Sequence, residues 1–317
     1  MTDPTQRPSS KHQALVDACK RLPPLPMAIV HPCDALSLAG AMAAAALNLI
    51  RPVLVGPHAR IAAAAAEAGL DPTGIETIDT PHSHASADRA VALVREGRVG
   101  ALMKGSLHTE ELMAAVVARD TGLRTERRIS HCYLMDVPRR PETLILTDAA
   151  VNIAPTLEEK VDIVQNAIEL AHAIGCADPR VAILSAMETV NPKVPSTIEA
   201  AALCKMADRG QIVGGTIDGP LALDNAIDPE AAAIKHIVSP VAGRANVLVV
   251  PDLEAGNMLA KSLSFLAGAD AAGIVLGARV PIVLTSRADS EISRLASCAV
   301  AVLAAQARRL KAIKAVG

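Results

Sequence analysis

Four short polar clusters in this sequence combine residue types that can bind anions or move protons. The first is the segment 104–109, which contains Lys104, Ser106, His108 and Thr109. A lysine and two hydroxyl groups, beside the free N–H groups at the start of a helix, suit an anion such as phosphate. The alternative is a plain strand-to-helix turn in which Thr109 caps the helix.

The second and third clusters each combine an aspartate with an asparagine after an apolar run. Asp148 and Asn152 could orient a ligand or simply make the hydrogen bonds of a turn. Asp252 can cap a helix, and capping explains that residue well. It does not explain Gly256 and Asn257, which are poor helix formers placed near a predicted helix start.

The fourth cluster contains Ser286, Arg287, Asp289 and Glu291. An arginine can hold phosphate through two parallel hydrogen bonds while a neighbouring carboxylate accepts a proton. Each such charge-assisted contact is worth roughly 1.5–3 kcal/mol. The structural alternative is a salt-bridged helix start, with Asp289 beginning the last helix and Arg287 as its partner.

Several other kinds of site are excluded or made less favourable by the sequence. It has no phosphate loop of the Gly-x-x-x-x-Gly-Lys-Ser/Thr type, no Gly-x-Gly-x-x-Gly after its first strand and no His-Glu-x-x-His. Its six cysteines form no Cys-x-x-Cys pair, which argues against a disulfide framework or a zinc site and favours a reduced, cytoplasmic protein. No cluster of carboxylates with metal-ligand spacing is evident, so we expect no tightly bound metal.

Composition argues against a nucleic-acid or membrane partner. The chain has 317 residues, a net charge of −2, one tyrosine, one phenylalanine and no tryptophan. Nucleic-acid binding usually needs a basic surface or aromatic side chains that stack on bases. The longest uncharged stretch, 35–50, is shorter than the ~20 residues of a membrane span. Residues 1–20 do not read as a signal peptide, and we expect them to be a disordered start.

The elements that must position the clusters alternate between strand-like and helix-like runs, which is typical of parallel βαβ units. In the first part of the chain, strands are predicted at 27–30, 52–56 and 99–103. In the later part, strands are predicted at 128–137, 143–146, 181–184 and 246–250, with a last pair around 277–281, and long helices at 156–175, 254–267 and 289–313. The clusters follow strands directly, where open α/β sheets bind ligands.

Together the clusters resemble those of the phosphate acetyltransferase and phosphate butyryltransferase family. The similarity covers the chain from about residue 27 to its end, in a consistent order. It is carried by 104–109, by 148–152 with 155–156, by 218–224, by 246–257 with 268–271, and by Ser286-Arg287. The run 185–193 resembles the butyryl-type branch more than the long acetyl-type branch.

This resemblance implies two α/β/α lobes related to the isocitrate and isopropylmalate dehydrogenase fold. It implies a discontinuous first lobe, 1–139 plus 277–317, a second lobe, 140–276, and an active site in the cleft between them. The proline-bounded segment 138–141 is then predicted as the crossing between lobes, with the return near Gly277. A homodimer is also implied.

The reaction implied by the resemblance is reversible acyl transfer between coenzyme A, as a substrate, and inorganic phosphate. Arg287 matches the family's phosphate clamp, and Ser286 matches the donor beside the thiol sulfur. The family's catalytic aspartate lies six residues after the arginine, where this chain has Ser293, so Asp289 or Glu291 must replace it or the acceptor lies elsewhere. Lys104, Ser106, His108, Thr109, Asp148, Asn152, Asp252 and Asn257 are the predicted substrate-binding residues.

Acetyl transfer within a ternary complex is the expected chemistry, with butyryl transfer as the first alternative. Ala149 stands where the acetyl-type branch has a cysteine, so an acyl-enzyme at that position is impossible. A metal- and nicotinamide-dependent dehydrogenase of the same fold is a more distant alternative. The third alternative is a non-catalytic protein that binds coenzyme A or acyl phosphate. It is supported by the serine that stands in place of the family's catalytic aspartate.

Overall fold

The computed structural model describes residues 11–138, 140–285 and 289–316, and it divides into two compact units. One is formed by Met1–Arg127 with Ala272–Gly317, and the other by Arg128–Ala271. Both crossings between the units therefore lie earlier in the sequence than the boundaries 139/140 and 276/277 that we predicted. Pro138 and Pro141, which we expected at the first crossing, lie within the second unit.

The first unit contains a mixed sheet, and the first polar cluster follows the carboxyl end of one of its strands. Its strands are β1 (Leu25–Val30), β2 (Ile50–Val55), β3 (Thr77–Ile78), β4 (Ala101–Lys104), β11 (Ile282–Val283) and most of β10 (Asp270–Leu276). They lie in the order β3-β2-β1-β4-β11-β10, parallel except for the antiparallel β10–β11 pair. Val30 pairs with Lys104, so the loops after β1 and β4 leave the same edge of the sheet.

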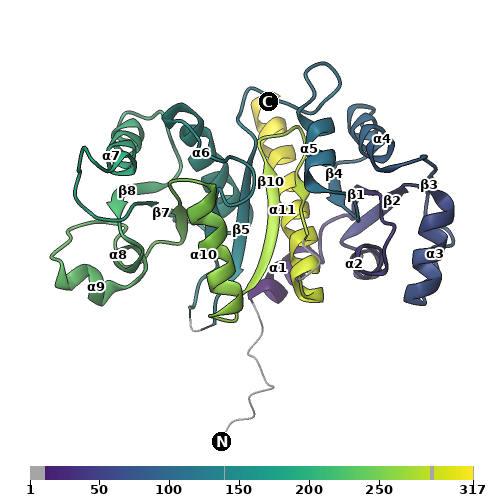
Figure 1. Cartoon of the computed structure of the whole chain (residues 1–317), viewed down its shortest axis with the longest axis horizontal. Helices are drawn as coiled ribbons and strands as arrows, with labels where there is room; N and C mark the ends of the chain where they lie inside the picture. The colour runs from purple at the N-terminus through teal and green to yellow at the C-terminus, as the bar shows by residue number, and fades with distance from the viewer. Residues whose placement is uncertain (1–10, 139, 286–288, 317) are drawn as a thin grey trace, which may run out of the picture. The chain divides into compact units, whose positions relative to one another are not determined.

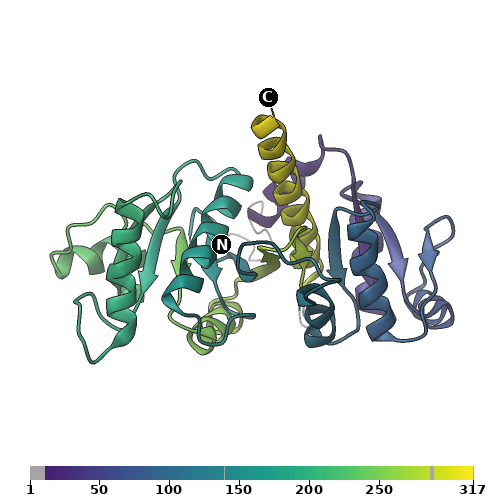
Figure 2. The same ribbon diagram turned by 90° about the horizontal axis from the view of Figure 1, so that it is seen from above.

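Helices cover both faces of this sheet, as the apolar strands require. They are α2 (Ala35–Ala46), α3 (His58–Ala68), α4 (Ser83–Arg95), α5 (Thr109–Val117) and α11 (Glu291–Val316). In Figure 1, α2 and α3 lie on one face while α4 and α5 lie on the other. Figure 2 shows α4 and α5 side by side from above. The predicted alternation of strands and helices is confirmed for this unit.

The expectation of a disordered start is wrong for the end of that segment. Residues Lys11–Cys19 form the helix α1, which packs against α11. Leu15, Val16 and Cys19 are buried, and the Cys19 thiol donates to the Ala299 carbonyl at 3.4 Å. The charged residues at the start of the chain hid this short apolar stripe, which becomes stable only when α11 covers it.

The second unit contains five strands that carry the second and third polar clusters. They are β5 (Ser130–Asp136), β6 (Leu144–Thr147), β7 (Arg180–Leu184), β8 (Thr216–Leu221) and β9 (Val247–Val249), in the order β5-β6-β9-β7-β8. The β5–β6 pair is antiparallel and the others are parallel. Strand β8 was not predicted because it contains Gly219 and Pro220, and such residues are tolerated mainly at a sheet edge, where β8 lies.

Helices also cover both faces of the strands of the second unit. They are α6 (Leu157–Ala173), α7 (Pro195–Asp208), α8 (Leu223–Ile227), α9 (Pro229–Ile234) and α10 (Leu253–Phe265). Figure 1 shows α6 and α7 on one face and α8 to α10 on the other. On the α10 face, Leu146, Leu184 and Leu248 form a buried cluster against which Leu259 and Leu263 pack. Apolar packing therefore holds helix α10 against this face of the strands.

The start of α6 offers a test of how local sequence sets these elements. The Thr156 hydroxyl accepts from the Glu159 N–H at 3.3 Å, and the Glu159 carboxylate accepts from the Thr156 N–H at 2.9 Å. We expect Thr156→Ala to lower the free energy of unfolding by about 1 kcal/mol, because a helix N–H loses its partner. Thr156→Ser keeps the hydroxyl and should stay within a few tenths of wild type in urea unfolding. Equal losses in the two variants would contradict this assignment.

Candidate active site

The loop 104–109 is pressed against the end of β1. The Gly105 N–H donates to the Val30 carbonyl at 2.8 Å, and the Ser106 N–H and hydroxyl both donate to the His31 carbonyl, at 2.9 and 2.8 Å. A Cβ atom at position 105 would lie 2.5 Å from the Val30 oxygen and 2.6 Å from the His31 oxygen. Only glycine allows the two backbone segments to come this close. Their contact fixes the position of Lys104 and the start of the following helix.

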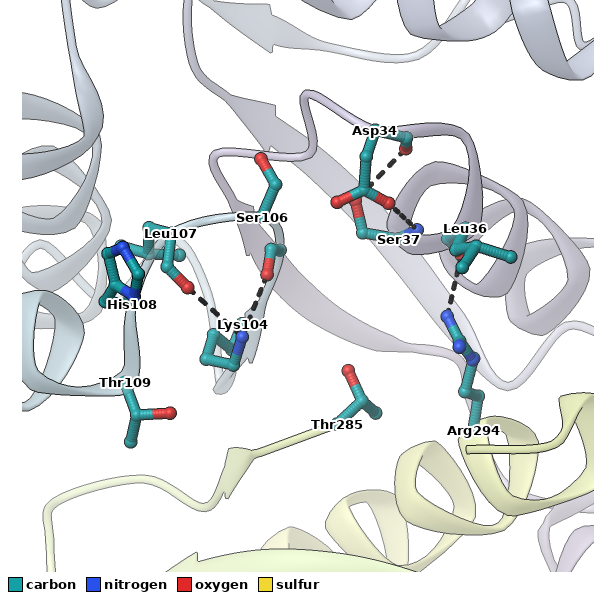
Figure 3. A pocket seen from close by; sticks show the side chains of 11 residues that line it. Asp34, Leu36, Ser37, Lys104, Ser106, Leu107, His108, Thr109, Thr285 and Arg294 are labelled. Carbon is teal, nitrogen blue, oxygen red and sulfur yellow. Dashed lines mark hydrogen bonds between the residues drawn. The ribbon is translucent and has the colours of Figure 1, made fainter. Parts of the chain in front are cut away.

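A pocket of about 240 Å³ opens beside this loop in the first unit (Figure 3). Its walls come from the starts of α2 and α5 and from the residues on either side of the fourth cluster. The lining residues are Asp34, Leu36, Ser37, Lys104, Gly105, Ser106, Leu107, His108, Thr109, Thr285 and Arg294. All four predicted substrate-binding residues of the first cluster therefore line one pocket.

The pocket is built to attract an anion. Lys104 and Arg294 supply two positive charges, and the first turns of α2 and α5 face it with the positive ends of their helix dipoles. The Lys104 ammonium donates to the carbonyls of Gly105 and Leu107, each at 3.1 Å, so its position is fixed. Two oriented charges and two helix ends are the features that a phosphate group needs.

Arg294 also lines the pocket, and it was not among the residues predicted from the sequence. Its side chain is only 6% exposed. The guanidinium donates to the Leu36 carbonyl at 3.1 Å and to the Asp289 carbonyl at 3.1 and 3.3 Å. A Cβ atom on Gly40 would lie 3.2 Å from its Cδ, so this glycine makes room for the arginine across α2. One feature of the sequence could have indicated its role, namely a charged residue on the apolar face of the last helix.

The fourth cluster is only partly within the described residues. Ser286 and Arg287, our predicted catalytic pair, lie outside them. Thr285, directly before the pair, lines the pocket. Asp289 is half-buried and Glu291 is exposed, and neither is among the lining residues.

The last helix begins differently from the structural alternative that we considered. The Ser290 hydroxyl, rather than Asp289, accepts from the Ser293 N–H at 3.2 Å. The Ser290 hydroxyl also donates to the buried Ser293 hydroxyl at 3.0 Å. Ser293, at the position of the family's aspartate, therefore takes part in a serine pair at the helix start.

In the second unit, Asp148 organises the loop after β6. Its two carboxylate oxygens accept from the backbone N–H groups of His131, Ala150, Val151 and Asn152 at 3.0 to 3.2 Å, and from the Asn152 amide at 2.5 Å. The side chain is buried. Five donors occupy this carboxylate, so its place in the structure is that of a loop anchor.

The remaining predicted residues of the second unit meet around the same loop. Asp252 caps α10 by accepting from the Ala255 N–H at 2.8 Å, and the Asn257 amide donates to the Ala149 carbonyl at 3.3 Å. A Cβ atom on Gly256 would lie 2.8 Å from the Asp148 carbonyl oxygen. The Gly256-Asn257 pair, which capping did not explain, thus lets α10 approach the loop and binds the two together.

Asn152 also holds the first two residues of the second unit, Arg128 and Ile129. Its Oδ1 accepts from the Arg128 Nε at 2.7 Å, and its amide donates to the Ile129 carbonyl at 2.9 Å. Nearby His131 is buried, and its ring lies edge-on to Tyr133 with centroids 4.3 Å apart. Burial lowers the pKa of His131 to about 4, so its imidazole is neutral at pH 7.

Burial also determines the state of the cysteines, all six of which are free. It raises the pKa of Cys132, Cys204 and Cys298 to about 12 and that of Cys19 to about 11. These four thiols stay protonated near neutral pH, and a protonated thiol is a poor nucleophile. Across 11–138, 140–285 and 289–311, no three His, Cys, Asp or Glu side chains are arranged to hold a metal ion.

Comparison with known proteins identifies one family. The family model described as "Phosphate acetyl/butaryl transferase" matches residues 85–302. A phosphate acetyltransferase of Rhizobium meliloti is 64% identical over 307 residues, covering 97% of each chain. A phosphate butyryltransferase of Clostridium acetobutylicum is 42% identical over 253 residues, covering 80% of this chain and 84% of its own.

Solved structures confirm the predicted fold class. A branched-chain phosphotransacylase from Enterococcus faecalis V583 superposes with a TM-score of 0.77 at 32% identity, covering 89% of this chain and 99% of its own. A 4-hydroxythreonine-4-phosphate dehydrogenase from Klebsiella pneumoniae reaches a TM-score of 0.54 at 15% identity, covering 89% and 100%. The second likeness concerns the fold alone. The predicted relation to a dehydrogenase-type α/β fold is thereby borne out.

The anchoring role of Asp148 predicts a stability effect. In Asp148→Asn one carboxylate oxygen becomes an NH₂ group that faces N–H donors, so we expect the free energy of unfolding to fall by about 2 kcal/mol or more. Urea unfolding measures this loss. Asp252→Asn is the matched control, because asparagine caps a helix as well as aspartate does. A loss at Asp148 no greater than at Asp252 would contradict the anchoring role.

Proposed function

This chain belongs to the phosphate acetyl/butyryl transferase family, and we propose that it transfers an acetyl group reversibly between coenzyme A and inorganic phosphate. The observation that carries the proposal is the pocket of the first unit, where Lys104, Arg294 and two helix starts surround a space suited to phosphate. Acetyl-CoA with phosphate, and acetyl phosphate with coenzyme A, are the substrate pairs of the two directions.

Acetyl is the favoured acyl group. The phosphate acetyltransferase of R. meliloti shares 64% identity over nearly the whole chain, whereas the phosphate butyryltransferase of C. acetobutylicum shares 42% over a shorter region. The likeness of 185–193 to the butyryl-type branch does not outweigh this difference, since it involves one short run. Phosphate acetyltransferase activity is therefore the function that the relatives support.

Phosphate binding in the pocket follows from its donors. Lys104 is fixed by two carbonyls and Arg294 by three hydrogen bonds, so both charges are oriented before a ligand arrives. Donors fixed in advance stabilise a departing phosphate without reorganising during the reaction. We propose that Ser106, His108 and Thr109 line the same phosphate site and that Ser286 and Arg287 complete it.

Direct transfer between the two bound substrates is the proposed chemistry. Coenzyme A attacks the acetyl carbonyl carbon, and the carbon–oxygen bond to phosphate breaks as phosphate departs. Ala149 is buried at the foot of α10 and offers no nucleophile. The four cysteines whose pKa is raised to about 11 or 12 by burial are protonated thiols. Because a protonated thiol is a poor nucleophile, an acyl-cysteine is not favoured at any of them. We still propose a role in substrate binding for four residues of the second unit. They would act by holding the backbone around the substrate, and they are Asp148, Asn152, Asp252 and Asn257.

We further propose a reduced, cytoplasmic setting and a homodimer. Every cysteine is free, as expected where thiols are kept reduced. Within the described parts of the chain, no helix combines the length and apolar character needed to cross a membrane. Helix α10 leaves Met258 63% and Phe265 76% exposed, and these residues, seven apart, lie on one side of it. A second copy of this chain would cover that apolar stripe.

Phosphate-dependent release of the thiol from acetyl-CoA tests the activity. We expect Lys104→Ala to lower kcat/KM for phosphate by roughly 10- to 100-fold, the value of one charge-assisted contact. Arg287→Ala should lose at least as much. Lys205→Ala, an exposed lysine paired with Asp208, is the control and should leave the rate unchanged. Normal turnover by Arg287→Ala would refute the site, and absence of acyl transfer by the wild type would refute the function.

Light scattering after gel filtration tests the dimer. Phe265→Arg places a charge in the exposed stripe of α10, and we expect it to shift the protein from dimer to monomer because an unpaired charge would be buried on association. Ile234→Arg is the matched control, since Ile234 of α9 is 71% exposed in the same unit. A wild-type monomer, or a dimer that survives Phe265→Arg, would contradict the proposed interface.

A further inference from the structure

Acyl transfer to coenzyme A requires a proton acceptor. The thiol has a pKa near 8.5 when unperturbed and must lose its proton as sulfur attacks the carbonyl carbon. The acceptor must lie within hydrogen-bond reach of that sulfur, so it must line the space where the reaction occurs. Ser293 stands where the family has its aspartate, and its hydroxyl is buried in a pair with Ser290. A serine paired in this way cannot take the role of a carboxylate.

The two acidic residues that follow Arg287 are poorly placed for this task. Glu291 is exposed in the first turn of α11, and Asp289 is half-buried with its carbonyl bound to Arg294. Neither belongs to the lining of the pocket. Among the residues that do line it, Asp34 is the acidic one.

From this geometry we propose, on the basis of the proposed transferase activity, that Asp34 is the catalytic proton acceptor. Asp34 precedes α2 with extended backbone, and its Oδ1 accepts from the Ser37 N–H at 2.7 Å. None of the residues that the structure describes donates a hydrogen bond to Oδ2. One oxygen therefore fixes the carboxylate, while the other is available to a substrate.

The surroundings of Asp34 match the requirements of the step. Figure 3 shows Asp34, Lys104 and Thr285 around one space, with Arg294 at its side. The positive charges of Lys104 and Arg294 lie where phosphate would bind, and the Thr285 side chain lines the same space. A thiol placed between the acyl phosphate and this wall of the pocket would face the carboxylate.

In the direction of acetyl-CoA formation, Asp34 takes the proton from the coenzyme A sulfur as the carbon–sulfur bond forms. The bond between the acetyl carbon and the bridging phosphate oxygen breaks, and its electron pair leaves with phosphate. The proton then passes from Asp34 to phosphate, so the carboxylate is regenerated and no other reactant is needed. In the reverse direction, protonated Asp34 supplies the proton to the departing thiol.

Helix capping is the competing explanation for Asp34, and one substitution separates the two roles. Asparagine caps a helix as well as aspartate does but cannot accept the thiol proton. We expect Asp34→Asn to retain the wild-type thermal unfolding midpoint and to lower kcat by roughly 10²- to 10⁴-fold, the usual value of a positioned base. KM for phosphate should change little, because the cationic side of the pocket is intact.

The matched control is Asp228→Asn. Asp228 caps α9 in the second unit by accepting from the Glu230 N–H at 2.8 Å, and it has no role in the proposed site. It should leave both kcat and the unfolding midpoint unchanged. Asp34→Gly adds a second measurement, since glycine at this cap costs only a few tenths of a kcal/mol. Formate should restore part of its lost rate, while the same concentration of chloride should not.

The possible results distinguish this inference from the proposed function. If the wild type shows no acyl transfer, the proposed function itself fails. If the wild type is active and Asp34→Asn keeps full kcat, or loses only phosphate affinity, Asp34 is not the acceptor. A slow Asp34→Asn whose glycine counterpart gains nothing from formate would make Asp34 a fixed charge and overturn the assignment. A slow asparagine variant together with formate rescue would establish it.

Discussion

The pocket of the first unit depends on the close approach of two backbone segments at one edge of the sheet. Strands β1 and β4 are parallel, and Val30 pairs with Lys104, so their following loops leave the sheet side by side. The Gly105 N–H and the Ser106 hydroxyl then donate to carbonyls of the β1 end. A side chain at position 105 would break this arrangement, and with it the places of Lys104 and of the start of α5.

Arg294 extends this constraint to the last helix. Burying a guanidinium is costly unless its donors are satisfied, and carbonyls of Leu36 and Asp289 accept from it. Leu36 belongs to the first turn of α2, 258 residues away in sequence, so the arginine ties the start of α2 to the start of α11. Gly40 makes this contact possible. Arg294 therefore joins two helix starts and at the same time places a positive charge beside the pocket proposed to bind phosphate.

The features that the sequence predicted well are those decided within a few residues. The cap at Asp252 was visible as a polar residue after an apolar strand and before a predicted helix, and the apolar strands were visible from their composition. The missed features depend on distant partners. Strand β8 is stable because it lies at an edge beside β7, α1 because α11 covers it, and Arg294 is buried because Gly40 leaves it room.

Asp34 and Asp148 show most clearly where local sequence stops being informative about chemistry. Both follow an apolar strand and both precede small residues, so their sequence contexts are similar. The fold surrounds Asp148 with five N–H donors and gives Asp34 one. A carboxylate whose lone pairs are fully used stabilises a loop, and it could accept a proton only by losing those bonds. A carboxylate held by one oxygen is fixed in place and still has an acceptor to offer. The number of donors that the tertiary structure brings to each aspartate therefore separates an anchor from a candidate base.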